Sequence, residues 1–250
     1  MLKIRVMPTL LHKDLGLVKG IGFDSWRRVG TEMQTIRVYN LRKVDELVFL
    51  DIAATSAGRR PDFDLVDQLA DECFTPLTVG GGISSVEDVR DLLMAGADKV
   101  AVCTAAIERP DLVNQIAERF GSQSLVVAID VRAQGARHQV FTRAGTSPTG
   151  LDPVAVAVRA AEQGAGEILL TSVERDGTMS GYDIEMIRSV SRAVDVPVIA
   201  SGGCGSASDM ADALRAGAAA VAAASMFHFT ELTPLVAKQY LADQGFPVRL

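Results

Sequence analysis

The chain repeats part of its own sequence at a fixed distance. Residues 78 to 104 read TVGGGISSVEDVRDLLMAGADKVAVCT, and residues 199 to 225 read IASGGCGSASDMADALRAGAAAVAAAS. A shift of 121 superposes Gly82 on Gly203, and the same shift aligns the AGA triplets that follow. Self-similarity at a fixed period is typical of proteins built from repeated structural units.

The same register holds in a second part of the chain. ELVFLDI begins at Glu46, and the similar EILLTSV begins 121 residues later at Glu167. Chance similarity between two Gly- and Ala-rich stretches would not preserve one register across separate segments. The sequence therefore predicts a duplication, with halves of about residues 1–120 and 121–250.

Within each half, short apolar runs alternate with amphipathic stretches. Runs such as SLVVAID are nearly continuous and rich in β-branched residues, as strands buried on both faces are. Stretches such as SVEDVRDLLMAG have helical spacing, a polar first residue and a final Gly. Eight strands are expected, at residues 4–11, 46–52, 77–80, 99–103, 124–130, 167–172, 196–201 and 219–224.

Eight strands alternating with eight helices in two matched halves predict a single α/β domain, a (β/α)₈ TIM barrel, over residues 1–250. A doubly wound sheet is the alternative, but it would not need two matched halves. A length of 250 residues with 48% hydrophobic and 22% charged residues suits one such barrel.

Composition excludes several functions. The net charge of −6 argues against nucleic-acid binding, which favours a basic face. The three cysteines lack metal-ligand spacing and suit a reducing compartment, so we expect a cytoplasmic protein without a metal or cofactor. The first residues do not form a signal peptide, and no apolar run reaches the roughly 20 residues that span a bilayer.

Glycine pairs follow the third and seventh expected strands, and hydroxyl residues follow the fourth and eighth. Gly82 and Thr104 form the first of these groups, and Gly203 and Ser225 form the second. Bare backbone N–H groups beside a hydroxyl and a helix start can bind an anion. Two related sites at one barrel mouth predict a ligand with a phosphate at each end. The alternative is that the glycines only form tight turns.

These motifs resemble one known family from end to end. The segments DELVFLDI, TVGGGI, GADKV, VVAID, GAGEILLTS, RDGTMSGYD, IASGG and ASMFHF are similar to the HisF family, the cyclase subunit of imidazole glycerol phosphate synthase. The resemblance implies a (β/α)₈ barrel that forms a heterodimer with a glutaminase subunit. It also implies that ammonia from this partner cleaves and cyclises a ribulosyl aminoimidazole-carboxamide bisphosphate at the barrel mouth.

The resemblance also assigns the phosphate ligands. One phosphate would contact Gly82 and Thr104. The other would contact Asp176, Gly177, Gly203 and Ser225. Lys19, in the long loop after the first strand, matches a further active-site residue of the family.

One catalytic residue of the family pattern is missing. The family uses two aspartates as general acid and base, at the ends of the first and fifth strands. The second is present as Asp130, but Leu11 stands in place of the first, and leucine cannot transfer a proton. Cys103 replaces an Asn of the family beside the first anion site. His12 and Asp14 are the nearby residues that could replace the missing acid.

Charged residues open four of the expected strands and should point into the lower barrel, where they must pair. The four are Arg5, Glu46, Lys99 and Glu167. Two of each sign can form a neutral ring that closes the barrel. By resemblance, this ring is the gate through which ammonia enters. Asp98 and Gln123 match family positions that face the glutaminase.

The four charged residues of the ring are present, whereas Leu11 alters the opposite end of the barrel, and this combination favours one function over the others. The favoured interpretation is a paralogue that channels ammonia to a third partner, an amidotransferase that modifies surface sugars. The alternative is the cyclase of histidine biosynthesis, which makes imidazole glycerol phosphate and aminoimidazole carboxamide ribotide. A non-catalytic phosphate-binding scaffold is a third hypothesis, which the gate residues disfavour.

Overall fold

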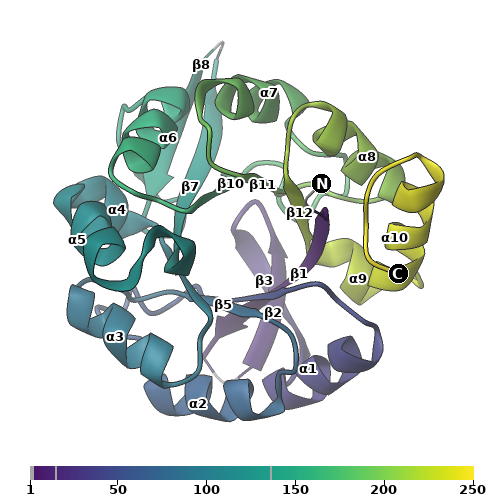
Figure 1. The fold of residues 1–250 in the computed structure, drawn as a ribbon, viewed down its shortest axis with the longest axis horizontal. Coiled ribbons are helices and arrows are strands. Elements are labelled where there is room, and N and C mark those ends of the chain that lie inside the picture. Colours follow the sequence, from purple (N-terminus) through teal and green to yellow (C-terminus); the bar gives the residue numbers. More distant parts are fainter. Residues whose placement is uncertain (1–2, 15, 136) are drawn as a thin grey trace.

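A closed barrel of parallel strands, surrounded by helices, forms the molecule (Figure 1). The computed structural model describes residues 3–14, 16–135 and 137–250. The parallel strands of the described chain are β1 Arg5–Lys13, β4 Leu47–Asp51, β5 Leu77–Gly80, β6 Lys99–Val102, β7 Leu125–Gln134, β10 Glu167–Ser172, β11 Val198–Ser201 and β12 Ala220–Ala223. Pairing of β1 with β12 and of β7 with β10 closes the ring. The predicted eight-stranded barrel is confirmed.

The helices lie outside the strands (Figure 1). They are α1 Glu32–Leu41, α2 Phe63–Glu72, α3 Val86–Met94, α4 Thr104–Glu108, α5 Asp111–Phe120, α6 Pro153–Glu162, α7 Ile184–Ala193, α8 Ala207–Arg215, α9 Ser225–Phe229 and α10 Pro234–Asp243, with a 3-10 turn at Ser122–Ser124. The short α4 and α9 were not expected, and each follows a strand end directly. No helix in the described chain is long and apolar enough to cross a membrane.

The 121-residue repeat extends to helix capping. Ser85 accepts a hydrogen bond from the Asp88 N–H, and the Asp88 carboxylate accepts from the Ser85 N–H in return. Ser206 and Asp209 form the same capping box at the start of α8. Each box satisfies N–H groups that the first helical turn leaves free. The boundary between the two halves stays a prediction.

Two antiparallel extensions of the barrel were missed by the sequence analysis. β2 Gly16–Ile21 and β3 Asp24–Gly30 form a hairpin beside the end of β1, and β8 Arg137–Thr142 with β9 Ser147–Pro148 extends β7. Much of β3 is exposed, so it lacks the apolar run by which strands were recognised. Both extensions lie at the carboxyl ends of barrel strands.

The barrel interior is built in layers, because alternate residues of a strand point to the same face. The first layer is charged and the second is apolar, and the third contributes to a pocket. The layers read Arg5, Met7 and Thr9 in β1; Glu46, Val48 and Leu50 at β4; Lys99, Ala101 and Cys103 at β6; and Glu167, Leu169 and Thr171 in β10. A separate, larger core fills the space between barrel and helices.

Candidate functional site

A pocket of about 1180 Å³, measured out to its open mouth, lies at the carboxyl ends of the strands. Active sites of TIM barrels lie at this end. The pocket brings together most of the residues singled out from sequence: Leu11, Gly82, Thr104, Asp130, Asp176, Gly177, Gly203 and Ser225. The hairpin contributes Phe23 and Trp26, which sequence reasoning missed. The chain's single Trp, within an otherwise polar stretch, was the available signal.

Asp130 places a largely enclosed carboxyl group in this pocket. It lies in β7 at the point where the strand leaves the barrel and pairs with β8. Burial raises the pKa of Asp130 to about 7, and the charge of Asp176 adds to the rise. The Cys103 thiol, 3.5 Å from Oδ2, opposes it by stabilising the carboxylate. Near neutral pH, Asp130 can therefore either donate or accept a proton.

Leu11 occupies the corresponding position at the end of β1. It is paired with Val18 of β2 and Leu50 of β4, and it is 8% exposed and lines the same pocket as Asp130. The pocket therefore presents an alkyl group at one of its two related strand ends. That Leu11 stands in place of a catalytic aspartate stays a prediction from the family resemblance.

The two candidate substitutes for that acid do not line the pocket. His12 alternates with Leu11 along β1 and places its Nδ1 2.6 Å from Oε1 of Glu32 in α1. Asp14 follows β1 with a positive φ of 58° and is also absent from the pocket lining. Neither residue is placed to act on a ligand held between the two anion sites.

The second candidate anion site, at Gly203 and Ser225, contains a hydroxyl group without a partner in the described chain. Ser225 Oγ is buried and has no hydrogen-bond partner among the residues that the structure describes, although such groups are nearly always paired. Gly203 has a φ of 104°, and a Cβ there would lie 2.2 Å from the Gly181 carbonyl oxygen. The glycine thus has a packing role as well, and the unpaired hydroxyl is the stronger sign of a ligand.

The polar groups of the first candidate anion site, at Gly82 and Thr104, are already hydrogen-bonded to other protein groups. The Gly82 N–H donates to Thr55 Oγ1 at 3.3 Å, and Thr104 Oγ1 accepts from the Arg143 N–H at 2.9 Å. The hydroxyl of Thr104 keeps its own proton to donate, but its position is set by Arg143. A ligand would find fewer free groups here than at the second site.

The β2–β3 hairpin is bonded to the loop that follows β10. Lys19 in β2 is almost fully buried, and its Nζ lies 2.5 Å from Oδ2 of Asp176. The Gly22 N–H donates to the Asp176 carbonyl at 2.8 Å. Burial raises the pKa of Asp176, and the Lys19 charge counteracts the rise. Lys19 therefore acts in this structure as the ion-pair partner of a pocket residue.

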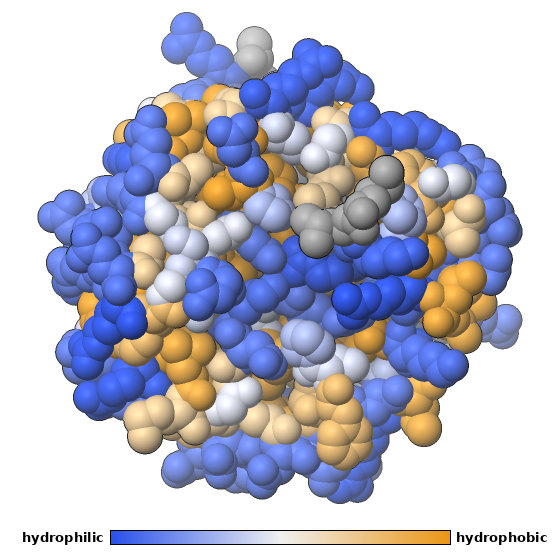
Figure 2. Space-filling view, viewed as in Figure 1, coloured by the Kyte–Doolittle hydropathy of each residue, from blue (hydrophilic) through white to orange (hydrophobic). Residues whose placement is uncertain are grey.

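The charged ring is complete at the opposite end of the barrel. Arg5 lies 2.6 Å from Glu46 and 3.0 Å from Glu167, and Lys99 lies 3.1 Å and 3.0 Å from the same two carboxylates. Burial would lower the pKa of Arg5, but the two glutamates outweigh it and the pKa is raised. Figure 2 shows this face, with hydrophilic side chains gathered at its centre and apolar patches around them.

Asp98 and Gln123 are exposed at this amino-terminal end. The Asp98 carboxylate accepts a hydrogen bond from the Leu77 N–H at 2.8 Å, and the Gln123 amide donates to the Phe120 carbonyl at 3.1 Å. Large apolar side chains are exposed at the nearby ends of α1, α2 and α3: Leu41 is 85%, Phe74 82% and Met94 79% exposed. Exposed apolar groups beside polar ones are typical of a protein interface.

Comparisons with known proteins agree with this geometry. Residues 5–233 match a family model described as "Histidine biosynthesis protein". The chain is 51% identical over 253 residues to proteins named "Imidazole glycerol phosphate synthase subunit HisF" from two strains of Caulobacter vibrioides, covering 100% of this chain and 97% of each relative. The chain therefore belongs to the HisF family, the cyclase subunits of imidazole glycerol phosphate synthase.

Proposed function

We propose that this protein is the cyclase subunit of an imidazole glycerol phosphate synthase. It would use ammonia to cleave and cyclise a ribulosyl aminoimidazole-carboxamide bisphosphate, giving imidazole glycerol phosphate and aminoimidazole carboxamide ribotide. The observation that carries the proposal is Asp130, a largely enclosed carboxyl with a pKa of about 7, in a pocket with an anion site at each half of the barrel. Identity to named HisF proteins supports this function over the surface-sugar interpretation.

Ring closure needs protons both delivered and removed, and one group with a pKa near the working pH can serve in both steps. Neutral Asp130 would protonate the leaving nitrogen, and ionised Asp130 would take a proton from the attacking amine. The two anion sites would fix the ends of the substrate so that its reactive centre lies beside Asp130. Lys19 would balance the charge of Asp176 next to the second phosphate.

The ammonia would enter through the charged ring. The apolar layer above the ring includes Ala101, Ala128, Ala220 and Ala222, whose small side chains separate the ring from the pocket. A neutral molecule the size of ammonia suits such an interior better than an ion does. We therefore propose that a glutaminase subunit docks over the ring as a heterodimer, contacting Asp98, Gln123 and the exposed Phe74. Location in the cytoplasm stays a prediction.

The test is to mix the protein with its native glutaminase subunit, glutamine and the bisphosphate, and to measure both products. Formation of imidazole glycerol phosphate and the ribotide in equal amounts is expected. Asp130→Asn should abolish both without preventing the complex. Stable complex formation with no product from the wild-type chain would contradict the proposal.

Leu11 favours a second candidate function. An alkyl group at a position that the family uses for acid–base catalysis would suit a paralogue that passes ammonia to a separate amidotransferase for surface sugars. The same assay separates the two: the paralogue would release ammonia from glutamine when complexed, yet leave the bisphosphate unchanged.

A further inference from the structure

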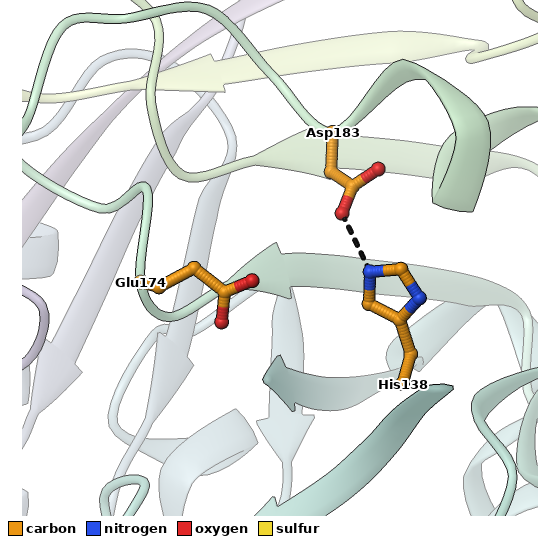
Figure 3. A group of neighbouring side chains, drawn as sticks. All are labelled: His138, Glu174 and Asp183. Carbon is orange, nitrogen blue, oxygen red and sulfur yellow. Dashed lines mark hydrogen bonds and ion pairs between the residues drawn. The ribbon is translucent and has the colours of Figure 1, made fainter. Parts of the chain in front are cut away.

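Three side chains of types that can bind metal ions converge outside the pocket, from three separate segments of the chain (Figure 3). His138 lies on β8, Glu174 in the loop after β10, and Asp183 at the N-cap of α7. One ligand atom from each lies within 4.8 Å of the other two. None of the three lines the pocket, and the proposed catalysis uses none of them.

Each of the two carboxylates accepts a hydrogen bond from a backbone N–H group. The two Glu174 oxygens accept from the Ala133 N–H at 3.0 and 3.2 Å. Asp183 Oδ1 accepts from the Met186 N–H at 3.1 Å, which leaves Oδ2 to face His138 Nε2 at 3.0 Å. Metal ligands are commonly oriented by such outer hydrogen bonds. Figure 3 shows the Glu174 carboxylate turned toward the His138–Asp183 pair.

We propose that His138, Glu174 and Asp183 form a binding site for Zn²⁺ or a similar divalent transition metal. One imidazole nitrogen and two carboxylate oxygens suit such an ion, and the two negative charges match its charge. Bonds of about 2.0–2.2 Å in tetrahedral geometry bring ligand atoms to about 3.4 Å apart. The His138–Asp183 pair, at 3.0 Å, lies slightly inside this spacing and would open a little to admit the ion in place of the hydrogen-bond proton. The exposed Glu174 would reach the ion by a side-chain rotation that releases the Ala133 N–H. Water would complete the coordination.

A simple Asp–His hydrogen bond is the competing explanation. It explains why His138 and Asp183 lie together, but it does not involve Glu174. The metal would join the β7–β8 extension to the segment that immediately precedes Arg175 and Asp176 at the pocket. The sequence predicted no metal site, because these ligands are 36 and 9 residues apart and share no motif.

Isothermal titration of the full chain with Zn²⁺ tests the site, with Co²⁺ absorption to report tetrahedral coordination. We expect one ion per chain with a micromolar or lower Kd. Glu174→Gln and Asp183→Ser should each weaken binding at least about tenfold, and His138→Gln should weaken it most. Serine keeps a capping oxygen for α7, so Asp183→Ser removes the ligand without removing the cap.

Two matched variants serve as controls. His12→Gln removes a second His–carboxylate pair, which has no third ligand among the described residues. Cys73→Ser removes a partly exposed thiol. Both should bind Zn²⁺ like the wild type. Circular dichroism checks that each variant is folded. Unsaturable binding by the wild type, equal affinity of folded Glu174→Gln, or loss of binding in either control would overturn the proposal.

Discussion

The burial that raises the pKa of Asp130 into the range useful for proton transfer also lowers the stability of the folded protein at neutral pH. This pKa rises from 3.8 to about 7 on folding. Between pH 3.8 and about pH 7, the carboxyl group is therefore protonated in the folded state but ionised in the unfolded state. Stability therefore falls as pH rises through this window and stays low above it. The shift of about 3 units corresponds to as much as about 4 kcal/mol.

We predict that Asp130→Asn stabilises the folded protein at pH 8, by a few kcal/mol at most, because the amide resembles the neutral acid and carries no charge. At pH 4 the gain should vanish. Urea unfolding of both proteins across this range measures the difference. Burial lowers the pKa of His228 to about 4, so this residue makes stability rise with pH in the same range. Because His228 is present in both proteins, comparing the variant with the wild type at each pH removes its contribution. A gain that does not depend on pH would contradict the assigned pKa.

Leu11 leads to the second prediction at this scale. A positioned acid–base group contributes about 10²–10⁴-fold in rate, or roughly 3–5 kcal/mol. The wild type should therefore turn over the bisphosphate with ammonia more slowly than a HisF protein that has both aspartates. Leu11→Asp should recover part of the rate, because Asp130 and the proposed second anion site remain unchanged. Recovery should be incomplete, since Cys103 still replaces the family's Asn.

Steady-state kinetics with saturating ammonia measure this gain in kcat. Leu11→Asn is the matched control. Asparagine is polar and similar in size to aspartate, but its amide cannot exchange a proton at neutral pH. An equal gain in both variants would show that polarity, and not acid–base chemistry, is what the position lacks.

At the scale of elements, the two proposed anion sites differ in the hydroxyl group that each offers to a ligand. Ser225 Oγ is buried without a hydrogen-bond partner in the described part of the chain, whereas Thr104 Oγ1 accepts a hydrogen bond from the Arg143 N–H. We predict that Ser225→Ala weakens inorganic phosphate binding about five- to tenfold, the equivalent of roughly 1–1.5 kcal/mol for one hydrogen bond. Thr104→Ala should have a smaller effect. Phosphate titration followed by NMR compares the variants, and a larger loss from Thr104→Ala would reverse the assignment.

The elements also show how far sequence reasoning reaches. The strand at 77–80 was predicted with its observed bounds, because a buried parallel strand is apolar along its whole length. The 121-residue register relates Gly82 to Gly203 from the order of the amino acids alone. The β2–β3 hairpin was missed because its stability depends on partners such as Asp176 and not on an apolar run. For the same reason, the Lys19–Asp176 contact and the His138 cluster could not be predicted.

At the scale of the whole molecule, the two ends of the barrel must work together. Asp98 lies on the rim of the amino-terminal face, and Lys99 is one residue away in the charged ring. These neighbours should affect different steps. Asp98→Lys reverses a charge on the proposed docking face. Lys99→Met removes one cation from the ring, which leaves Arg5 alone to pair with both glutamates.

We predict that Asp98→Lys prevents co-elution with the glutaminase and lowers glutamine-dependent turnover, while turnover with added ammonia is unchanged. The Lys99→Met variant should co-elute normally with the glutaminase. Its ratio of glutamine-dependent to ammonia-dependent rate should be lower than that of the wild type, because water entering through the broken ring would allow the passing ammonia to be protonated to ammonium. Lys99→Met should also lower the free energy of unfolding. Removing one partner of a fully buried ion pair costs roughly 3–5 kcal/mol, and the loss here should be smaller because these groups are partly exposed. Gel filtration and the two rates distinguish the outcomes. If Lys99→Met kept the wild-type ratio, the ring would be a structural closure of the barrel and not a gate.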